Sequence, residues 1–214
     1  MKNLKLGALF ISALFIGFPQ AAGAAGMAPA KHVRGTVVSL AATVLTVSTA
    51  SGPVKVPLSP KTAVLGVVPG SVSDIKPGTF IGTANVVGPS SSRALEVVVF
   101  PKAMAGTGEG DYPWDLPAGK SHSMMTNGTV ASHGGSMMTN GTVSHAMNGN
   151  SKTVTLTYKG GTKTVVIPPG VPIVLIAPGS RALLTSGAHV VAFPTPSGLA
   201  RAVIVGIKGT VPPM

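Results

Sequence analysis

Apolar and polar side chains alternate along much of this chain, and the alternation is clearest in Val44–Thr49 and Val54–Leu58. A period of two is typical of β-strands with one buried face. The two runs are separated by Ala50–Pro53, which contains the Ser, Gly and Pro expected of a tight turn. We therefore predict a β-hairpin here.

The same pattern predicts further short strands on both sides of a central segment. In the first half they are Val33–Leu40, Ala63–Val67, Phe80–Val87 and Ala94–Phe100. In the second half they are Thr142–His145, Thr153–Tyr158, Thr164–Ile167, Ile173–Ile176, His189–Phe193 and Ala200–Ile207. Gly and Pro contribute 28 and 19 residues, which favours turns over helices. The predicted fold class is all-β.

The two halves repeat one another at a constant spacing of 109 residues. Leu45, Val47, Gly52, Val56, Leu58 and Pro60 correspond to Val154, Leu156, Gly161, Val165, Ile167 and Pro169. We expect two tandem modules, residues 31–102 and 139–210, joined by a Gly/Met/His-rich linker at 103–138. Short strands of this number suit a small closed barrel similar to the OB-fold, with a β-sandwich as the alternative.

The first residues have the features of an export signal. Two lysines precede the apolar run Leu6–Phe18, and small residues follow it, so we expect residues 1–24 to be removed. That run is too short to span a bilayer comfortably, and no later stretch is apolar for long enough. We expect a periplasmic or secreted protein whose mature chain does not span a membrane. Cysteine is absent, which excludes disulfides and thiolate chemistry.

The formal net charge is +11, and it is unevenly distributed. Residues 116–214 contain no acidic side chain, so the second module is strongly basic. A basic surface attracts polyanions. Tyr158, Lys159 and Lys163 flank one hairpin turn and are candidates for such contacts. Aromatic residues make up only 4% of the chain, too few to provide the stacking platforms of single-strand binders, so we expect no nucleic-acid partner.

Several segments together resemble a known family: RGTVVSL, IKPGTFIGTA, RALEVVVFP, GTGEGDYPWDL, MTNGTV, VTLTYKGGTK and TVPPM. They are similar to exported bacterial proteins with tandem OB-like domains of unknown function, some of which are labelled metal ABC transporter permeases. The resemblance covers nearly all of the mature chain and implies the same fold. The permease label cannot apply literally, because no membrane-spanning segments are expected. The chain departs from the family pattern at Asp111, where His is expected, and in doubling the Met-Met-Thr-Asn-Gly segment.

That doubling places Ser123–Val130 and Ser136–Val143 thirteen residues apart. Within these copies, Thr126–Val130 and Thr139–Val143 are equivalent candidates for the first strand of the second module, and only one can occupy that place. We expect the second copy to be used, because it leads directly into the rest of the module.

The doubled segment is also rich in soft and borderline metal ligands. They are His122, Met124, Met125, His133, Met137, Met138, His145 and Met147. Thioethers with imidazoles favour Cu(I). The hypothesis is therefore a copper site, in a protein accessory to metal transport. The alternative is that these methionines pack against a barrel.

Glu109, Asp111 and Asp115 form the one cluster of carboxylates. They are candidates for acid–base chemistry or for binding a hard cation such as Ca²⁺, but we expect them to belong to a linker in which Trp114 packs against a barrel. His32 is expected to be solvated. No nucleophile elbow or phosphate loop is present. The sequence thus predicts an exported, non-enzymatic binding or scaffolding protein. The alternative is an envelope module that binds a polyanion or a partner protein through its basic second barrel.

Overall fold

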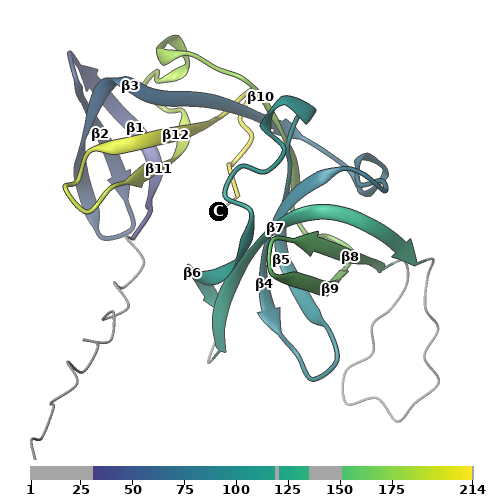
Figure 1. Ribbon diagram of the computed structural model, residues 1–214. Coiled ribbons are helices and arrows are strands. Elements are labelled where there is room, and N and C mark those ends of the chain that lie inside the picture. Colours follow the sequence, from purple (N-terminus) through teal and green to yellow (C-terminus); the bar gives the residue numbers. More distant parts are fainter. Residues whose placement is uncertain (1–30, 119–120, 135–150, 214) are drawn as a thin grey trace, which may run out of the picture.

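The computed structural model describes residues 31–118, 121–134 and 151–213, and this part of the chain is all-β (Figure 1). Three short 3-10 turns interrupt the strands, and no helix there is long and apolar enough to cross a bilayer. The strands are β1 (Val33–Ala41), β2 (Val44–Thr49), β3 (Gly52–Pro69), β4 (Phe80–Val87), β5 (Ser92–Val99), β6 (Gly110–Ala118), β7 (Ser121–Gly134), β8 (Lys152–Tyr158), β9 (Gly161–Ile167), β10 (Ile173–Pro178), β11 (His189–Pro194) and β12 (Ala200–Gly206).

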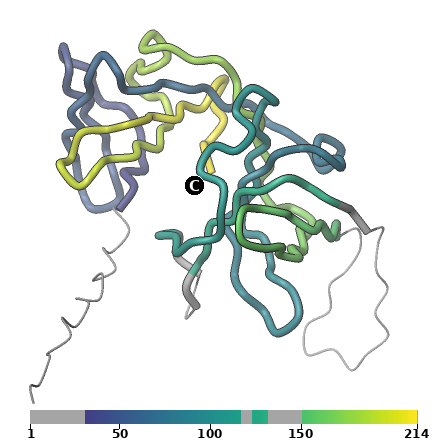
Figure 2. Tube along the Cα trace, viewed as in Figure 1, coloured from purple at the N-terminus to yellow at the C-terminus, as the bar shows by residue number. Residues whose placement is uncertain are grey.

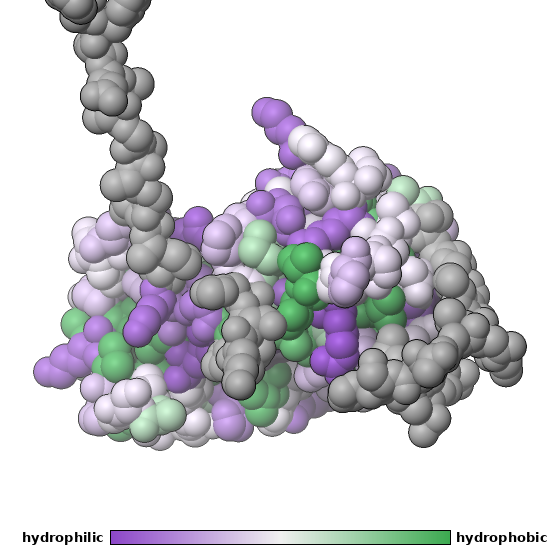
Figure 3. Space-filling view, turned by 90° about the horizontal axis from the view of Figure 1, so that it is seen from below, coloured by the Kyte–Doolittle hydropathy of each residue, from purple (hydrophilic) through white to green (hydrophobic). Residues whose placement is uncertain are grey.

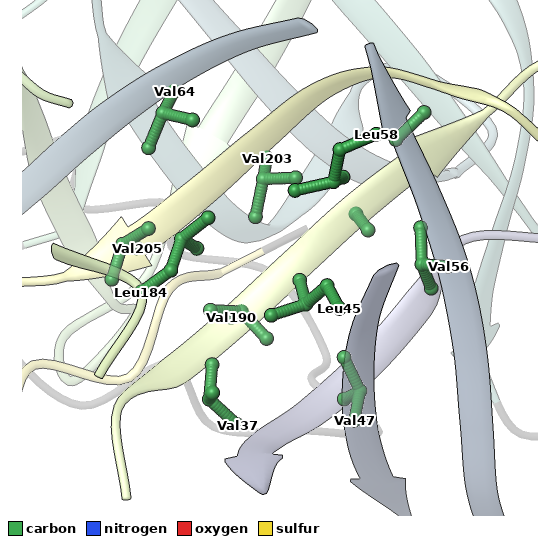
Figure 4. Packing of buried hydrophobic residues seen from close by; sticks show 12 residues of the cluster. Val37, Leu45, Val47, Val56, Leu58, Val64, Leu184, Val190, Val203 and Val205 are labelled. Atoms are coloured by element: carbon green, nitrogen blue, oxygen red, sulfur yellow. The ribbon is translucent and has the colours of Figure 1, made fainter. Parts of the chain in front are cut away.

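Five strands close into a barrel, which we call ring 1. β1, β2 and β3 follow one another antiparallel, β3 pairs parallel with β12, and β11 joins β12 back to β1. The predicted hairpin is β2–β3, and its inward positions are the apolar ones of the alternating pattern. Figure 4 shows this interior, with Leu45 and Val47 from β2 beside Val190 from β11 and Val203 from β12. All four are essentially excluded from solvent.

A second circuit of pairings, ring 2, follows the same order. β7, β8 and β9 are antiparallel, β9 pairs parallel with β5, and β4 joins β5 back to β7. Its interior contains Leu156 and Val165, packed with Ile81 from β4. Leu156 and Val165 are the repeat partners of Val47 and Val56, which are buried inside ring 1. Positions 109 residues apart are therefore buried in both rings.

The two rings exchange strands, which corrects the predicted division into contiguous modules. Residues 31–102 do not close their own barrel: the hairpin β4–β5 belongs to ring 2, and the hairpin β11–β12 of the second repeat completes ring 1. Figure 2 shows the exchange by colour, because the yellow C-terminal strands lie among the purple and blue ones. An alternating pattern specifies which face of a strand is buried. It does not specify whether the hairpin β4–β5 or the equivalent hairpin β11–β12 pairs with that strand.

A third apolar core lies between the rings. β3 continues past ring 1 and pairs antiparallel with β10, which corresponds to it in the repeat. Side chains on the outer faces of both rings pack here, including Val67, Ile176, Val191 and Phe193. The rings are thus joined by a buried interface and not only by a connecting segment.

The first copy of the doubled segment supplies the first strand of ring 2, so the expectation for the second copy is wrong. β7 contains Thr126–Val130, and Val130 is as buried in ring 2 as Val37 is in ring 1. The predicted linker 103–138 therefore contains two strands of the sheet, β6 and β7. β6 pairs with β7 along Gly110–Trp114, so the copy next to β6 is held in place by a local partner. The second copy, residues 136–143, lies outside the described residues.

Candidate functional site

The aromatic side chains of β6 lie against one end of ring 1. Tyr112 and Trp114 are two residues apart in the strand and so share a face. The Trp114 ring lies 4.3 Å from the His32 ring and 6.5 Å from the Phe193 ring, measured between centroids. Tyr112 meets Trp114 edge to face at 6.1 Å. The central segment thus brings its one tryptophan to the place where β1 begins and β11 ends.

A carboxylate next to Trp114 fixes this contact. Asp115 accepts hydrogen bonds from the backbone NH of His32 at 2.7 Å and from both terminal nitrogens of Arg34 at 2.6 and 3.1 Å. The Nδ1 atom of His32 lies 2.8 Å from the Asp115 Oδ1 atom. Burial by itself raises the pKa of Asp115, but the hydrogen bonds from His32 and Arg34 outweigh it and hold the pKa well below its usual range. Asp115 is therefore an ionised latch between β6 and ring 1.

A cleft of about 280 Å³ opens beside this latch. Its lining combines aromatic rings, prolines and one cation: His32, Tyr112, Pro113, Trp114, Phe193, Pro194, Thr195, Pro196 and Arg201. The prolines come from β6 and from the end of β11 with the loop that follows it, and they offer no backbone NH group. Seen from below, apolar surface gathers in the middle of the molecule, next to hydrophilic residues (Figure 3).

The charge of the cleft is positive. Arg34 is engaged by Asp115, whereas Arg201 has no hydrogen bond or ion pair within the described residues. Burial raises the pKa of Tyr112, and the positive charge of Arg201 partly offsets that effect. No acidic side chain is part of the lining. Arg201 therefore provides a free guanidinium at an otherwise largely apolar site.

A polar network behind Tyr112 holds its ring in place. The Tyr112 hydroxyl donates to the Gly108 carbonyl at 3.3 Å and accepts from the Asn127 amide at 3.1 Å. The same amide donates to Gly108 at 2.9 Å. The indole Nε1 of Trp114 is buried and has no hydrogen-bond partner in the described part of the protein. An unpaired buried donor is uncommon and costs free energy.

The three predicted carboxylates do not form one site. Glu109 accepts from the backbone NH of Lys159, Asp111 pairs with Lys163 at 2.8 Å, and Asp115 is held by ring 1. The prediction that Trp114 packs against a barrel is confirmed. The charge of Lys163 is already balanced by Asp111, so Lys163 is not a free cation for the predicted contact with a polyanion.

The predicted copper ligands are only partly described. Met125 is 1% exposed and packs in the core between the rings, whereas the neighbouring Met124 is half-buried. Met125 is therefore unavailable to a metal while ring 2 is folded. The backbones of His122 and His133 lie in β7, and their side chains, like Met137, Met138, His145 and Met147, lie outside the description. No group of three His, Cys, Asp or Glu side chains suited to a metal occurs in the described residues.

Sequence reasoning missed three residues of the cleft. The prediction that His32 is solvated is wrong, because its side chain is only 9% exposed. Nothing in the sequence indicates that Phe193 and Arg201 contribute to the cleft, because they are distant in sequence from β6 and reach it through the exchanged hairpin β11–β12. No protein-family model, curated protein or solved structure matches the chain.

Proposed function

We propose that this is an exported, non-enzymatic binding protein that holds a small organic ligand in the cleft between β6 and ring 1. The observation that carries the proposal is the cleft itself, walled by Tyr112, Trp114 and Phe193 beside the free guanidinium of Arg201. Small-molecule sites are typically concave and apolar, with a few polar groups that orient the ligand.

The arrangement of ring 1 supports an OB-like interpretation of the fold. Its strands follow the order β1-β2-β3-β12-β11, with one parallel pair between β3 and β12. The end of β11 and the loop before β12 supply Pro194, Thr195 and Pro196 to the cleft. In OB-folds the loop between the last two strands contributes to ligand sites. This support is an analogy of fold, and the chemistry of the cleft carries the proposal.

A binding role suits His32 and Asp115, a pair that resembles catalytic machinery. Asp115 orients His32, as a carboxylate does in many acid–base sites. However, the His32 ring is enclosed by Trp114 at 4.3 Å and by Phe193 at 4.7 Å. It is thus built into the wall of the cleft, and the pair serves to position β6.

The proposal can be tested by fluorescence, because Trp114 is the only tryptophan of the chain. The mature protein is titrated with members of a library of small polar metabolites, and saturable changes in tryptophan emission are followed. We expect at least one compound to bind, and Tyr112→Ala to weaken it by about tenfold, a loss of about 1.4 kcal/mol. Tyr158→Ala, which changes the chain's other tyrosine outside the cleft, is the matched control.

The result is interpreted on variants that retain the thermal transition of the parent protein. Binding that is lost in Tyr112→Ala and kept in Tyr158→Ala supports the cleft. Equal losses in both variants, or no saturable change with any compound, overturn the proposal.

A further inference from the structure

We infer that the cleft takes an anionic ligand built on a single ring, with its carboxylate or equivalent group on Arg201 and its ring face between Tyr112 and the prolines. This inference rests on the proposed function, because it names the ligand of the same cleft.

Two arginines near the cleft, Arg34 and Arg201, differ in whether their charge is balanced. Both terminal nitrogens of Arg34 donate hydrogen bonds to Asp115, so the positive charge of Arg34 is balanced. Arg201 is exposed at the start of β12 and has no such partner among the described residues. A free guanidinium presents a planar fork of donors that fits a carboxylate or a phosphate. With no acid on the lining, the cleft selects for an anion.

The remaining wall favours a ring next to that anion. Pro113, Pro194 and Pro196 contribute apolar faces without NH donors, and Tyr112 and Trp114 contribute aromatic ones. Aromatic side chains offer broad apolar contact area, against which the face of a ring can pack. The polar recognition is therefore concentrated at Arg201, whereas the rest of the cleft recognises shape.

The size of the cleft limits the ligand to about one ring. A volume of about 280 Å³ is slightly below the range of roughly 300–1,000 Å³ that is typical of small-molecule sites. An extended polymer would make most of its contacts outside such a cleft. The same chemistry, a ring with an acidic group, occurs in cyclic carboxylic acids and in acidic sugars, and the experiment must distinguish these two sources.

The test uses the mature full-length protein and five probes that do not absorb where tryptophan does. Cyclohexanecarboxylate and glucuronate carry the ring and the acid, cyclohexanecarboxamide and glucose carry the ring alone, and acetate carries the acid alone. Each is titrated against Trp114 emission and by calorimetry at low salt. We expect one of the two ring acids to bind at least about tenfold more tightly than its neutral counterpart and than acetate. Which ring acid binds identifies the source.

The role of Arg201 is tested by Arg201→Gln, with Arg93→Gln as the matched control. Both arginines are exposed and each is the second residue of the last strand in its hairpin, β12 and β5. We expect Arg201→Gln to remove the preference for the acid, about a tenfold loss, and Arg93→Gln to keep it.

The failures are distinguishable. Neutral rings that bind as well as the acids, or an acid preference that survives Arg201→Gln, would overturn this inference and leave the proposed function standing. Binding of none of the probes, while a metabolite from the library does bind in a manner sensitive to Tyr112, also overturns the inference alone. A lack of any Tyr112-dependent ligand overturns the proposed function itself.

Discussion

Val67 of β3 and Ile176 of β10 lie directly opposite one another in an antiparallel pair. The two residues also correspond to one another under the 109-residue spacing of the sequence. The flanking pairs mirror one another, Leu65 with Pro178 and Pro69 with Val174. A contact in which the same segment meets itself is the signature of a two-fold axis. The pairing of β3 with β10 is therefore two-fold symmetric in its register, and the hairpins β4–β5 and β11–β12 each pair across it with strands from the other half of the chain.

The exchange predicts that the protein can be split without losing its fold. Residues 25–134 and 151–214, expressed together as separate polypeptides, should form a one-to-one complex, because ring 1 needs β11–β12 and ring 2 needs β4, β5 and β7. Size-exclusion chromatography with light scattering measures the complex. Neither fragment alone should show a cooperative unfolding transition. A transition in residues 25–134 alone would instead indicate a barrel closed within one repeat.

The centre of the two-fold axis should be essential to that complex. Val67→Asp places a carboxylate in the core between the rings, where Val67 is completely buried. A buried unpaired charge is destabilising by about 3 kcal/mol or more, so we expect the two fragments to separate. Val38→Asp is the control, since Val38 of β1 is 48% exposed. Complex formation by Val67→Asp as complete as that of Val38→Asp would contradict the arrangement.

Gly128 and Gly141 occupy the same position in the two copies of the doubled segment, so replacing each in turn tests which copy forms β7. A methyl group on Gly128 would lie 2.6 Å from the Thr157 carbonyl oxygen, and one on Gly35 would meet Ser48 in the same way. We expect Gly128→Ala to lower the free energy of unfolding by about 2 kcal/mol through overpacking. Gly141→Ala changes the corresponding residue of the second copy and should have no effect. Chemical denaturation of both variants measures this, and the reverse result would assign the strand to the second copy.

The all-β class, the β2–β3 hairpin and the phase of its core could be predicted because they follow from local alternation. The exchange of hairpins between the rings could not be predicted, because β5 and β12 have matching apolar patterns. Either strand could pair with the exposed edge of β3 or of β9. Sequence pattern does not distinguish two partners with the same interface. The choice between them depends on the path that β3 and β10 take across the axis.

The candidate site was predictable only in its β6 half. The Pro-Trp-Asp-Leu motif and its packing against a barrel could be anticipated, because a lone Trp in a polar segment needs an apolar partner. Its partners His32, Phe193 and Arg201 come from the two ends of the chain. They meet only through the exchanged hairpin, so no spacing in the sequence indicates them.

The copper hypothesis remains a prediction, and the structure makes it more specific. Met125 is buried between the rings, so Met125→Leu, a change of similar volume, should leave Cu(I) affinity unchanged. Replacing Met137 and Met138 together by Leu should weaken Cu(I) binding by about tenfold, through the loss of two soft ligands. Competition with a chromophoric Cu(I) chelator measures both variants. Equal loss in the Met125 variant would contradict the separation of core and ligand methionines, and no binding by the parent protein would end the hypothesis.

The latch formed by Asp115 predicts how stability depends on pH. Its pKa is lowered in the folded protein, so the stabilisation is complete above the unfolded-state pKa of about 4 and decreases as the pH falls below that value. At pH 7 we expect Asp115→Asn to lower the free energy of unfolding by about 1–3 kcal/mol, because hydrogen bonds to a charged group are lost. Urea denaturation at pH 7 and pH 3 should show this difference shrinking in acid. Glu109→Gln, at an exposed carboxylate outside the latch, should change little at either pH. A difference for Asp115→Asn that is the same at both pH values would show that packing, and not charge, holds β6 against ring 1.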